Sequence, residues 1–467
     1  MVESQAQSFK TRMINKISLA PMVRILSRAY GADYVFSEEI IDRKFQHCVR
    51  YENQDLNCID YISTRDYAVI LRCIKEEKEQ FILQIGTNNA QTAIQAVEKV
   101  QEDICGVDVN MGCPKKFSVG GGMGSALMRD IDNAKFIMKS LVDKFGQLMS
   151  VSCKIRVLGT FEETMNYILA MQDAGVHWIS IHPRTAAQES KVPARWFIVK
   201  KIIDSGLVKI PVLGSGDLFS PIDINQFIQF TGASGVIVAR GAIHNCALFT
   251  QKQEMLNPNT YEENFELWID NTQEQQQKEE SVLQKQIFEQ ENQKTDNAKQ
   301  KNKKSGGGDD ENVEFSLNLV KVFETRYQKY PMLVPILDQV REYFRLCIEF
   351  GNHFQNAKYV ILYMLKTHKD HFELFKQLQY GRNFQDYARI LEIEYMLKDV
   401  DQIKQLHFDA QYYRKNKNII DEIVKAKQAQ TDDGLNAQVG SKRTNEEILN
   451  EQQIQQIEDG NLKRLKT

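Results

Sequence analysis

The chain has 467 residues, of which 42 % are hydrophobic and 26 % are charged, as is usual for a folded protein of two to three domains. Its 59 Lys and Arg nearly balance 62 Asp and Glu, which excludes a polycationic coat protein but not a local basic groove for nucleic acid. No stretch approaches the roughly 18 apolar residues of a membrane span, and Met1 to Lys16 lacks the apolar core of a secretion signal. The eight cysteines show no paired spacing, so we expect a reducing compartment and neither a disulfide scaffold nor a metal site.

Strand-like and helical segments alternate from about Ile14 to Phe249. The expected strands are Ile17–Ala20, Tyr34–Ser37, Phe81–Ile85, Val107–Asn110, Ser150–Ile155, Trp178–His182, Val212–Gly214 and Val236–Ala239. The expected helices between them include Asn89–Glu102, Ile131–Lys144, Phe161–Ala174 and Ile222–Thr231. Short, nearly continuous apolar strands are typical of parallel strands covered on both faces. Eight of them over about 235 residues predict an α/β fold, a (β/α)8 TIM barrel. A doubly wound open sheet is the alternative, but no GxGxxG follows the first strand.

Composition divides the chain into four segments. We expect residues 1–250 to form the barrel, 251–312 a low-complexity polar insert or linker, 313–400 a smaller all-α domain, and 401–467 a polar, mostly disordered tail. In the third segment two sets of apolar residues recur at helical spacing: Leu337, Val340, Phe344 and Ile348, then Ala357, Ile361 and Leu365. The insert is rich in Gln, Glu, Lys and Asn, so it cannot bury enough apolar surface to offset the entropy of ordering.

Polar side chains stand at the carboxyl ends of most predicted strands, where barrels place their chemistry. Small-residue turns at Gly214–Asp217 and Arg240–Ala242 open helices, so their backbone N–H groups predict a phosphate site. The alternative is that these glycines only permit tight turns. Lys154 needs an anionic partner at its strand end, either a flavin that gains negative charge on reduction or a neighbouring carboxylate.

Three uncharged groups complete this set of strand-end residues. Gln84 and Asn110 offer amide edges that suit a planar heterocycle, or that satisfy loop backbone instead. His182 is either a ligand of a phosphate or ring, or a histidine satisfied within the core.

Cys113 differs from the other seven cysteines in its surroundings. It follows a predicted strand, lies between Gly112 and Pro114, and precedes two lysines, whose positive charge would tune a thiol toward proton exchange near neutral pH. The glycine-rich run Gly120–Gly124 after it allows the loop to move toward a ligand. Cys113 is therefore a catalytic candidate, with an inert loop thiol as the alternative.

Together these motifs resemble the dihydrouridine synthase family. The resemblance rests on Leu19-Ala20-Pro21-Met22, Val107-Asp108-Val109-Asn110-Met111-Gly112-Cys113-Pro114, Gly121-Gly122-Met123-Gly124 and Cys153-Lys154-Ile155-Arg156. Tyr30-Gly31-Ala32-Asp33 and Ser37-Glu38-Glu39-Ile40-Ile41-Asp42 look like the eukaryotic branch that acts at position 20 of tRNA. The resemblance covers about Ile14–Phe249 and resumes more weakly at Leu337–Lys366, which looks like the family's helical tRNA-binding domain.

The resemblance implies an FMN barrel that reduces a uridine in tRNA to 5,6-dihydrouridine, with NADPH as the reductant. Flavin N5 would deliver hydride to uracil C6, and Cys113 would give a proton to C5 as general acid. The implied flavin contacts are Pro21, Met22, Val23, Gln84, Lys154, His182, Gly214, Ser215, Gly216, Arg240 and Gly241. The implied substrate contacts are Asn110, Arg156, Arg184, Lys115 and Lys116 at the barrel mouth and Lys358 on the helical domain.

Two rival hypotheses stay open. Ile25–Ala29 is too short for the three turns of the family's first helix, which favours a non-catalytic tRNA-binding protein derived from a synthase. Another FMN barrel acting on a small substrate, such as dihydroorotate, is the second rival, although it would not need the helical domain. We expect a monomeric, cytoplasmic protein, and the basic tail clusters Lys442-Arg443 and Lys463–Lys466 are a candidate nuclear signal or RNA contact.

Overall fold

The computed structural model describes residues 16–19, 23–188, 192–257, 332–397, 413 and 417–425. Eight parallel strands form a ring, in which each strand pairs with two neighbours and the β2–β7 pairing completes the closure. The ring strands are β1 (Lys16–Leu19), β2 (Val35–Phe36), β7 (Phe81–Gly86), β8 (Gly106–Asn110), β9 (Ser150–Arg156), β10 (Trp178–His182), β11 (Val212–Gly214) and β12 (Gly235–Val238). A short ninth strand, β3 (Ile40–Ile41), extends the sheet along β7. The predicted barrel is confirmed, and the open-sheet alternative is wrong.

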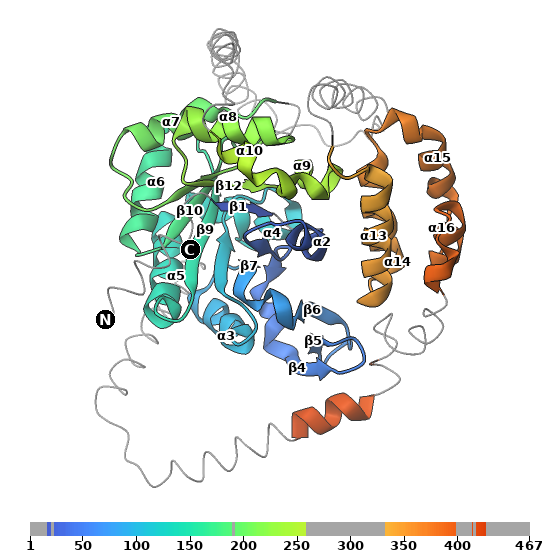
Figure 1. The fold of residues 1–467 in the computed structure, drawn as a ribbon. Coiled ribbons are helices and arrows are strands. Elements are labelled where there is room, and N and C mark those ends of the chain that lie inside the picture. The colour runs from blue at the N-terminus through green and yellow to red at the C-terminus, as the bar shows by residue number, and fades with distance from the viewer. Residues whose placement is uncertain are drawn as a thin grey trace, which may run out of the picture. The chain divides into compact units, whose positions relative to one another are not determined.

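Helices cover the outside of this ring (Figure 1). They are α2 (Arg24–Ala29), α3 (Ala90–Val100), α4 (Lys116–Val119), α5 (Ile131–Phe145), α6 (Phe161–Asp173), α7 (Trp196–Asp204), α8 (Pro221–Thr231), α9 (Arg240–His244) and α10 (Lys252–Leu256). Local sequence fixes several helix starts, because Asn89, Thr160 and Ser220 each accept a hydrogen bond from a backbone N–H of the first turn. As expected from the sequence, α2 is short, with only six residues.

The lower interior of the barrel is apolar. Side chains two residues apart on a strand share a face, so each strand presents a series of positions to the inside. The apolar cluster at this level consists of Phe36, Ile82, Trp178, Leu213 and Ile237. One step further toward the carboxyl ends, the inward positions of β7, β8 and β9 become polar, at Gln84, Asp108 and Ser152. The barrel therefore has an apolar base and a polar upper layer, on which the candidate site rests.

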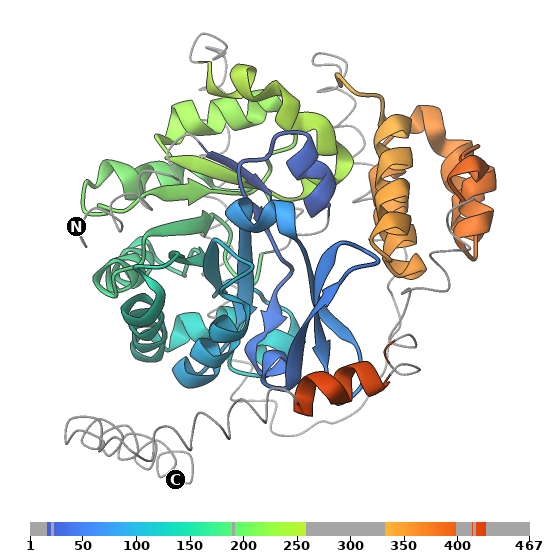
Figure 2. The ribbon, with the colours of Figure 1, turned by 60° about the horizontal axis from the view of Figure 1, so that its bottom comes forward.

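An antiparallel sheet that we did not anticipate is inserted between β3 and β7. Its strands are β4 (Cys48–Asn53), β5 (Cys58–Ser63) and β6 (Val69–Ile74), which stand apart from the parallel ring in Figure 2. The strands carry charged residues that pair across the sheet, with Asp60 directly opposite Arg72. These charges interrupt the apolar pattern, and for that reason the sequence did not predict strands here.

The helical segment consists of α13 (Ile336–Glu349), α14 (Phe354–Leu365), α15 (Phe372–Tyr380) and α16 (Phe384–Ile390). The expected inward positions Val340, Phe344 and Ile348 are buried. Gln339 ties α13 to the barrel, because its Nε2 donates to Asn245 Oδ1 at 2.9 Å and its Oε1 accepts from the Ala247 N–H at 3.1 Å. The helices therefore pack against the barrel through buried polar bonds as well as apolar contacts.

The ends of the predicted domains fall mostly outside the described residues. The polar insert lies within 258–331 apart from its first few positions, and the tail is described only at 413 and 417–425, where a helix forms. The predicted domain boundaries therefore stay predictions. Short 3-10 helices complete the described elements: η1 (Asp42–His47), η2 (Lys75–Gln80), η3 (Gly124–Arg129), η4 (Cys246–Gln251), η6 (Lys369–His371) and η7 (Glu394–Leu397). None of the helices in the described ranges is long and apolar enough to cross a membrane.

Candidate functional site

The barrel gathers the predicted strand-end residues at one mouth. Asn110 on β8 is the register partner of Lys154 on β9, and Arg156 on β9 is the register partner of His182 on β10. Because all eight strands are parallel, their carboxyl ends open on the same side of the ring. Residues that are more than 150 positions apart in the sequence, such as Gln84 and Arg240, therefore face a common space.

A chain of hydrogen bonds leads from the barrel interior to the Cys113 loop. Asp108 Oδ2 accepts from Gln84 Nε2 at 2.8 Å, and Gln84 Oε1 accepts from Asn110 Nδ2 at 2.9 Å. Asn110 Oδ1 then accepts from the backbone N–H groups of Gly112 and Cys113, both at 3.0 Å. Gln84 and Asn110 thus satisfy each other and the loop backbone, the alternative that the sequence had left open. Sequence reasoning missed Asp108, although a carboxylate between two buried valines of a strand was the available signal.

Cys113 is partly buried where the loop after β8 enters α4. Burial raises the pKa of its thiol, and the nearby Glu39 carboxylate raises it further, although the backbone N–H of Lys115 opposes the shift. The two lysines that we expected to lower this pKa point into solvent instead, since the side chains of Lys115 and Lys116 are exposed. The Cys113 thiol therefore keeps its proton at neutral pH.

Glu39 and Ser118 line the same side of the Cys113 loop. Ser118 Oγ is buried and donates to Glu39 Oε1 at 2.8 Å. Gly124 has a φ of +57°, and a Cβ there would lie 2.4 Å from Ser118 Oγ and 3.1 Å from Cys113 Cβ. A glycine is needed at 124 because both the backbone conformation and the close approach exclude a side chain.

A cluster of charged groups lies at the ends of β10, β11 and β12. Asp217 accepts from Arg184 Nη2 at 2.5 Å and from Arg240 Nη2 at 2.8 Å, while Arg184 Nη1 lies 3.1 Å from His182 Nε2. Two guanidinium groups share one carboxylate, so the cluster carries excess positive charge. Burial lowers the pKa of His182, and Lys154 and the neighbouring arginines lower it further, which keeps the ring neutral. This positive potential fits an anion such as a phosphate.

The glycines after β11 and β12 have more than one reason to be glycine. A Cβ at Gly214 would overlap the Phe227 ring at 1.9 Å, and one at Gly241 would lie 2.2 Å from the Leu218 carbonyl oxygen. Gly216 has a φ of +101°, and a Cβ there would lie 3.1 Å from the His182 ring. Close packing of the chain on itself accounts for these three positions, so their part in a phosphate site stays a prediction.

Lys154 is the cation that best suits an anionic ligand. It makes no hydrogen bond or ion pair with any residue in the described ranges. Burial lowers its pKa and Arg156 adds to this, while Asp108 opposes it. Arg156, by contrast, is already engaged, since its Nε donates to the Gly112 carbonyl at 2.9 Å and its Nη1 to the Thr185 carbonyl at 2.9 Å. The Lys154 ammonium suits an anionic ring, and the surplus of positive charge around Asp217 suits a phosphate. Together they fit a cofactor that carries both groups.

The remaining predicted residues are spread more widely. Pro21 and Met22 lie outside the described residues, and Val23 is buried in the core. Ser215 is buried, and its Oγ lies 3.3 Å from the Ile181 carbonyl oxygen. Lys358 Nζ donates to the carbonyls of Gln379 and Gly381 at 2.7 and 2.8 Å, so it holds the end of α15. No group of three or more His, Cys, Asp or Glu in the described part of the chain is arranged to hold a metal ion.

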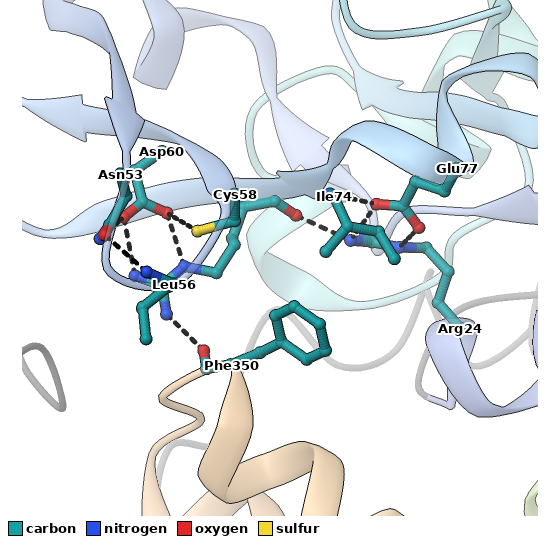
Figure 3. A network of polar contacts seen from close by, with 9 residues as sticks. Arg24, Asn53, Leu56, Cys58, Asp60, Ile74, Glu77 and Phe350 are labelled. Carbon is teal, nitrogen blue, oxygen red and sulfur yellow. Dashed lines mark hydrogen bonds and ion pairs between the residues drawn. The ribbon is translucent and has the colours of Figure 1, made fainter. Parts of the chain in front are cut away.

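A cavity of about 660 Å³ lies between the barrel, β6 and the helices α13 and α14. Its lining includes Val23, Arg24, Glu38, Arg72, Phe350 and Tyr359. Ion pairs hold both of its arginines in place. Arg24 pairs with Glu77 at 2.8 Å, as Figure 3 shows. Arg72 pairs with Asp60 at 2.6 Å and donates to the Phe350 carbonyl. The sequence did not predict the part of the cavity lining that β6 provides, because the antiparallel sheet was not predicted.

Comparisons with known proteins agree with the motifs at the strand ends. The sequence model of the family "Dihydrouridine synthase (Dus)" matches residues 33–313, which is more than half of the chain. A tRNA-dihydrouridine(20) synthase, NAD(P)+, of Schizosaccharomyces pombe is 35 % identical over 248 residues, covering 50 % of this chain and 52 % of that protein. The enzyme of the same name from Saccharomyces cerevisiae is 39 % identical over 191 residues, covering 38 % of this chain and 50 % of that protein.

A third relative carries other tRNA positions in its name. It is the tRNA-dihydrouridine(20a/20b) synthase, NAD(P)+, of Saccharomyces cerevisiae, which is 34 % identical over 237 residues, covering 49 % of this chain and 60 % of that protein. The chain thus spans about half the length of the first two relatives. The family match begins after β1 and covers the other seven barrel strands, with the mouth at which Asn110, Cys113 and Lys154 meet. On this evidence the chain belongs to the dihydrouridine synthase family.

Proposed function

We propose that this protein reduces a uridine of tRNA to 5,6-dihydrouridine, with NADPH as the reductant and Cys113 as the proton donor. One observation carries the proposal: the Cys113 loop stands at the same barrel mouth as Lys154, which has no partner in the described ranges, and the cationic cluster around Asp217. Reduction of a flat, electron-poor base requires a proton donor and groups that stabilise negative charge. The protonated thiol can donate the proton, and the cationic groups at the mouth can stabilise the charge.

The residues at the mouth fit FMN. The backbone N–H groups of the turns after β11 and β12, together with Arg240, would hold its phosphate. Lys154 and Gln84 would meet its ring with an ammonium and an amide edge. When bound, FMN supplies the hydride that uracil C6 receives. We assign Pro21 and Met22 to the same contact on the basis of the sequence motif alone.

Cys113 completes the reduction as a general acid. Addition of hydride at C6 leaves negative charge on C5 and O4 of the uracil, and the thiol proton moves to C5 while the sulfur keeps the electron pair. A thiol that stays protonated at neutral pH suits this role better than a thiolate would. Arg156 binds the carbonyls of Gly112 and Thr185, so it holds the Cys113 loop against the loop after β10.

The substrate must be presented as an extruded base. A uridine stacked inside folded tRNA cannot reach a barrel mouth, so it has to leave the stack, and cationic groups must grip the backbone phosphates. The exposed side chains of Lys115 and Lys116 are suited to this contact. We propose position 20 as the target, since two of the relatives named above carry that position in their names. The monomeric state and the cytoplasmic location stay predictions from the sequence.

The first test measures the product directly. Recombinant protein is incubated with NADPH and unmodified tRNA, and mass spectrometry of the digest locates a uridine that has gained two hydrogens. We expect one modified position, lost when that uridine is replaced by cytidine, and a fall in rate of about 100-fold or more in Cys113→Ala. The absorbance spectrum of the purified protein reports bound flavin in both variants.

The other outcomes identify the rivals. Folded, flavin-loaded protein that binds tRNA and leaves it unchanged would be a tRNA-binding protein, with the six-residue α2 as the first suspect. Yellow protein with no affinity for tRNA would instead be an enzyme of a small substrate.

A further inference from the structure

We propose that Asp108 is a positioning residue that sets the direction of the hydrogen-bond chain through Gln84 and Asn110 to the backbone of Cys113. The inference rests on the proposed function in one respect, namely that Cys113 is the proton donor. It adds a residue that touches neither the uracil nor the thiol and acts through two amides.

The chain begins at a carboxylate sealed inside the barrel. Asp108 is fully buried, and both of its oxygens are occupied, Oδ2 by Gln84 Nε2 and Oδ1 by Ser152 Oγ at 2.8 Å each. Lys154 on the adjacent strand is the charged group that acts on Asp108, and it favours the ionised form. Burial opposes that form and raises the pKa of Asp108 to about 6, so Asp108 is largely ionised at neutral pH.

An ionised carboxylate can only accept hydrogen bonds, and this fixes every amide that follows. Gln84 must turn its Nε2 toward Asp108, which leaves Oε1 facing Asn110. Asn110 must then turn its Nδ2 toward Gln84, which leaves Oδ1 facing the loop, where it accepts two backbone N–H groups. Reversing either amide would bring two donors or two acceptors face to face inside the barrel.

The same constraint determines which hydrogen-bonding groups of Gln84 remain free to bind a flavin ring at the barrel mouth. After its bonds to Asp108 and Asn110, Gln84 keeps one N–H on Nε2 and one lone pair on Oε1. This donor and acceptor pair matches the neighbouring carbonyl and N–H groups on the pyrimidine edge of a flavin. Asp108 therefore acts on both the loop that carries Cys113 and the amide edge offered to the cofactor.

The test compares variants that change the direction of the hydrogen bonds through Gln84 and Asn110 with a control variant that leaves this direction unchanged. Asp108→Asn keeps the shape but lets the side chain donate, so the amides are free to reverse. Asp108→Asn combined with Gln84→Glu restores the direction toward Asn110, because the carboxylate that the second substitution introduces can only accept. Ser152→Ala is the matched control, since it removes a bond to Asp108 without touching the chain of amides. Because that bond lowers the pKa of Asp108, all variants are compared at pH 8.5, where the carboxylate stays ionised without it.

The first readout is the alkylation rate of Cys113 by iodoacetamide, followed by peptide mass spectrometry on flavin-loaded protein without tRNA. We expect a rise of about fivefold in Asp108→Asn, a return toward the wild-type rate in the double variant, and a change below about twofold in Ser152→Ala. The second readout is the dissociation constant and absorbance spectrum of FMN, which should change in Asp108→Asn and stay changed in the double variant. Turnover of tRNA by Asp108→Asn should fall in kcat with KM nearly unchanged.

Two results would overturn the inference. One is an unchanged alkylation rate and flavin spectrum in Asp108→Asn, and the other is an equal effect in Ser152→Ala. If Asp108→Asn does not fold, Gln84→Met tests the same chain, because it removes the link between Asp108 and Asn110 without adding charge near Cys113 and should also speed alkylation. Failure of the proposed function shows separately, as wild-type protein that forms no dihydrouridine while its Cys113 alkylation still responds to position 108.

Discussion

At the scale of single residues, the notable feature is a cysteine whose surroundings protect its proton. Most reactive cysteines have a lowered pKa, because their task is nucleophilic attack. Cys113 is held in the opposite condition by burial and by Glu39, which is itself bound by Ser118. A raised pKa is a liability for a nucleophile and an advantage for a general acid, so the site distinguishes the two roles.

Replacing Glu39 tests this interpretation. Glu39→Gln removes a negative charge beside the thiol, so the pKa of Cys113 should fall and more thiolate should be present at a given pH. We expect alkylation of Cys113 at pH 7.5 to accelerate about three- to tenfold, and the alkaline limb of the activity profile to move to lower pH. Alkylation rates measured from pH 6 to 10 provide the check.

The control for this change is the neighbouring carboxylate. Glu38 is exposed and is not among the groups that act on the Cys113 pKa, so Glu38→Gln should leave the alkylation profile unchanged. An unaltered profile in Glu39→Gln would show that burial alone holds the proton on Cys113.

At the scale of elements, the inserted antiparallel sheet links the barrel to the helical segment. Arg72 on β6 pairs with Asp60 on β5, which is fully buried, and donates to the Phe350 carbonyl next to the end of α13. Asp60 also accepts from Asn53 and lies beside the Cys58 sulfur. The ion pair is thus part of a buried network, in which removal of one charge leaves the opposite charge in the protein interior.

Arg72→Met should therefore destabilise the protein by about 3–5 kcal/mol, because it removes the guanidinium that balances the charge of the buried Asp60 carboxylate. Equilibrium unfolding in urea measures this change. Arg345→Met on α13 is a suitable comparison, since Arg345 pairs with two glutamates at the surface and its loss should cost about 0–1 kcal/mol. Equal losses in the two variants would contradict the structural role given to Arg72.

Sequence reasoning worked unevenly at this scale. All eight barrel strands were predicted to within one residue at each end, because continuous apolar, β-branched segments are specified locally. β4, β5 and β6 were missed, because Arg50, Asp60 and Arg72 break the apolar pattern and their partners are known only in the fold. Helices α13 and α14 were found, because their apolar residues recur at a helical period.

At the scale of the whole molecule, His244 lies where the barrel meets the helical segment. It ends α9, contacts the Tyr363 ring of α14 at a centroid distance of 4.9 Å, and its Nδ1 lies 3.2 Å from Thr367 Oγ1. Burial lowers the pKa of His244 to about 3, and the neighbouring His368, Arg240 and Lys366 add to this. The contact between the barrel and the helical segment thus contains a buried histidine whose neutral form is favoured.

This makes the stability of the protein depend on pH. In the unfolded chain the pKa of His244 is about 6.5, so between that value and about 3 the unfolded state binds a proton that the folded state does not. The contribution of His244 to stability is therefore lost as pH falls through this window, by up to about 1.4 kcal/mol per pH unit.

The prediction is measured by urea unfolding at pH 7.5 and 5.5. Between pH 7.5 and pH 5.5 the free energy of unfolding should fall by about 1 kcal/mol less in His244→Gln than in the wild type. His353→Gln changes an exposed histidine far from this interface and is measured alongside as the comparison. Parallel slopes in all three proteins would exclude His244 as the origin of the acid sensitivity.

By itself the sequence determined the parallel barrel and the identity of its strand-end residues. Strand and helix periodicity, the Cys113 loop and Lys154 are encoded in short segments, so neighbouring residues suffice to recognise them. Only the tertiary structure decided the part played by Asp108, the closing bond from Arg72 to Phe350 across 278 residues, and the protonated condition of Cys113. These depend on burial and on partners distant in the chain, and no local pattern carries that information.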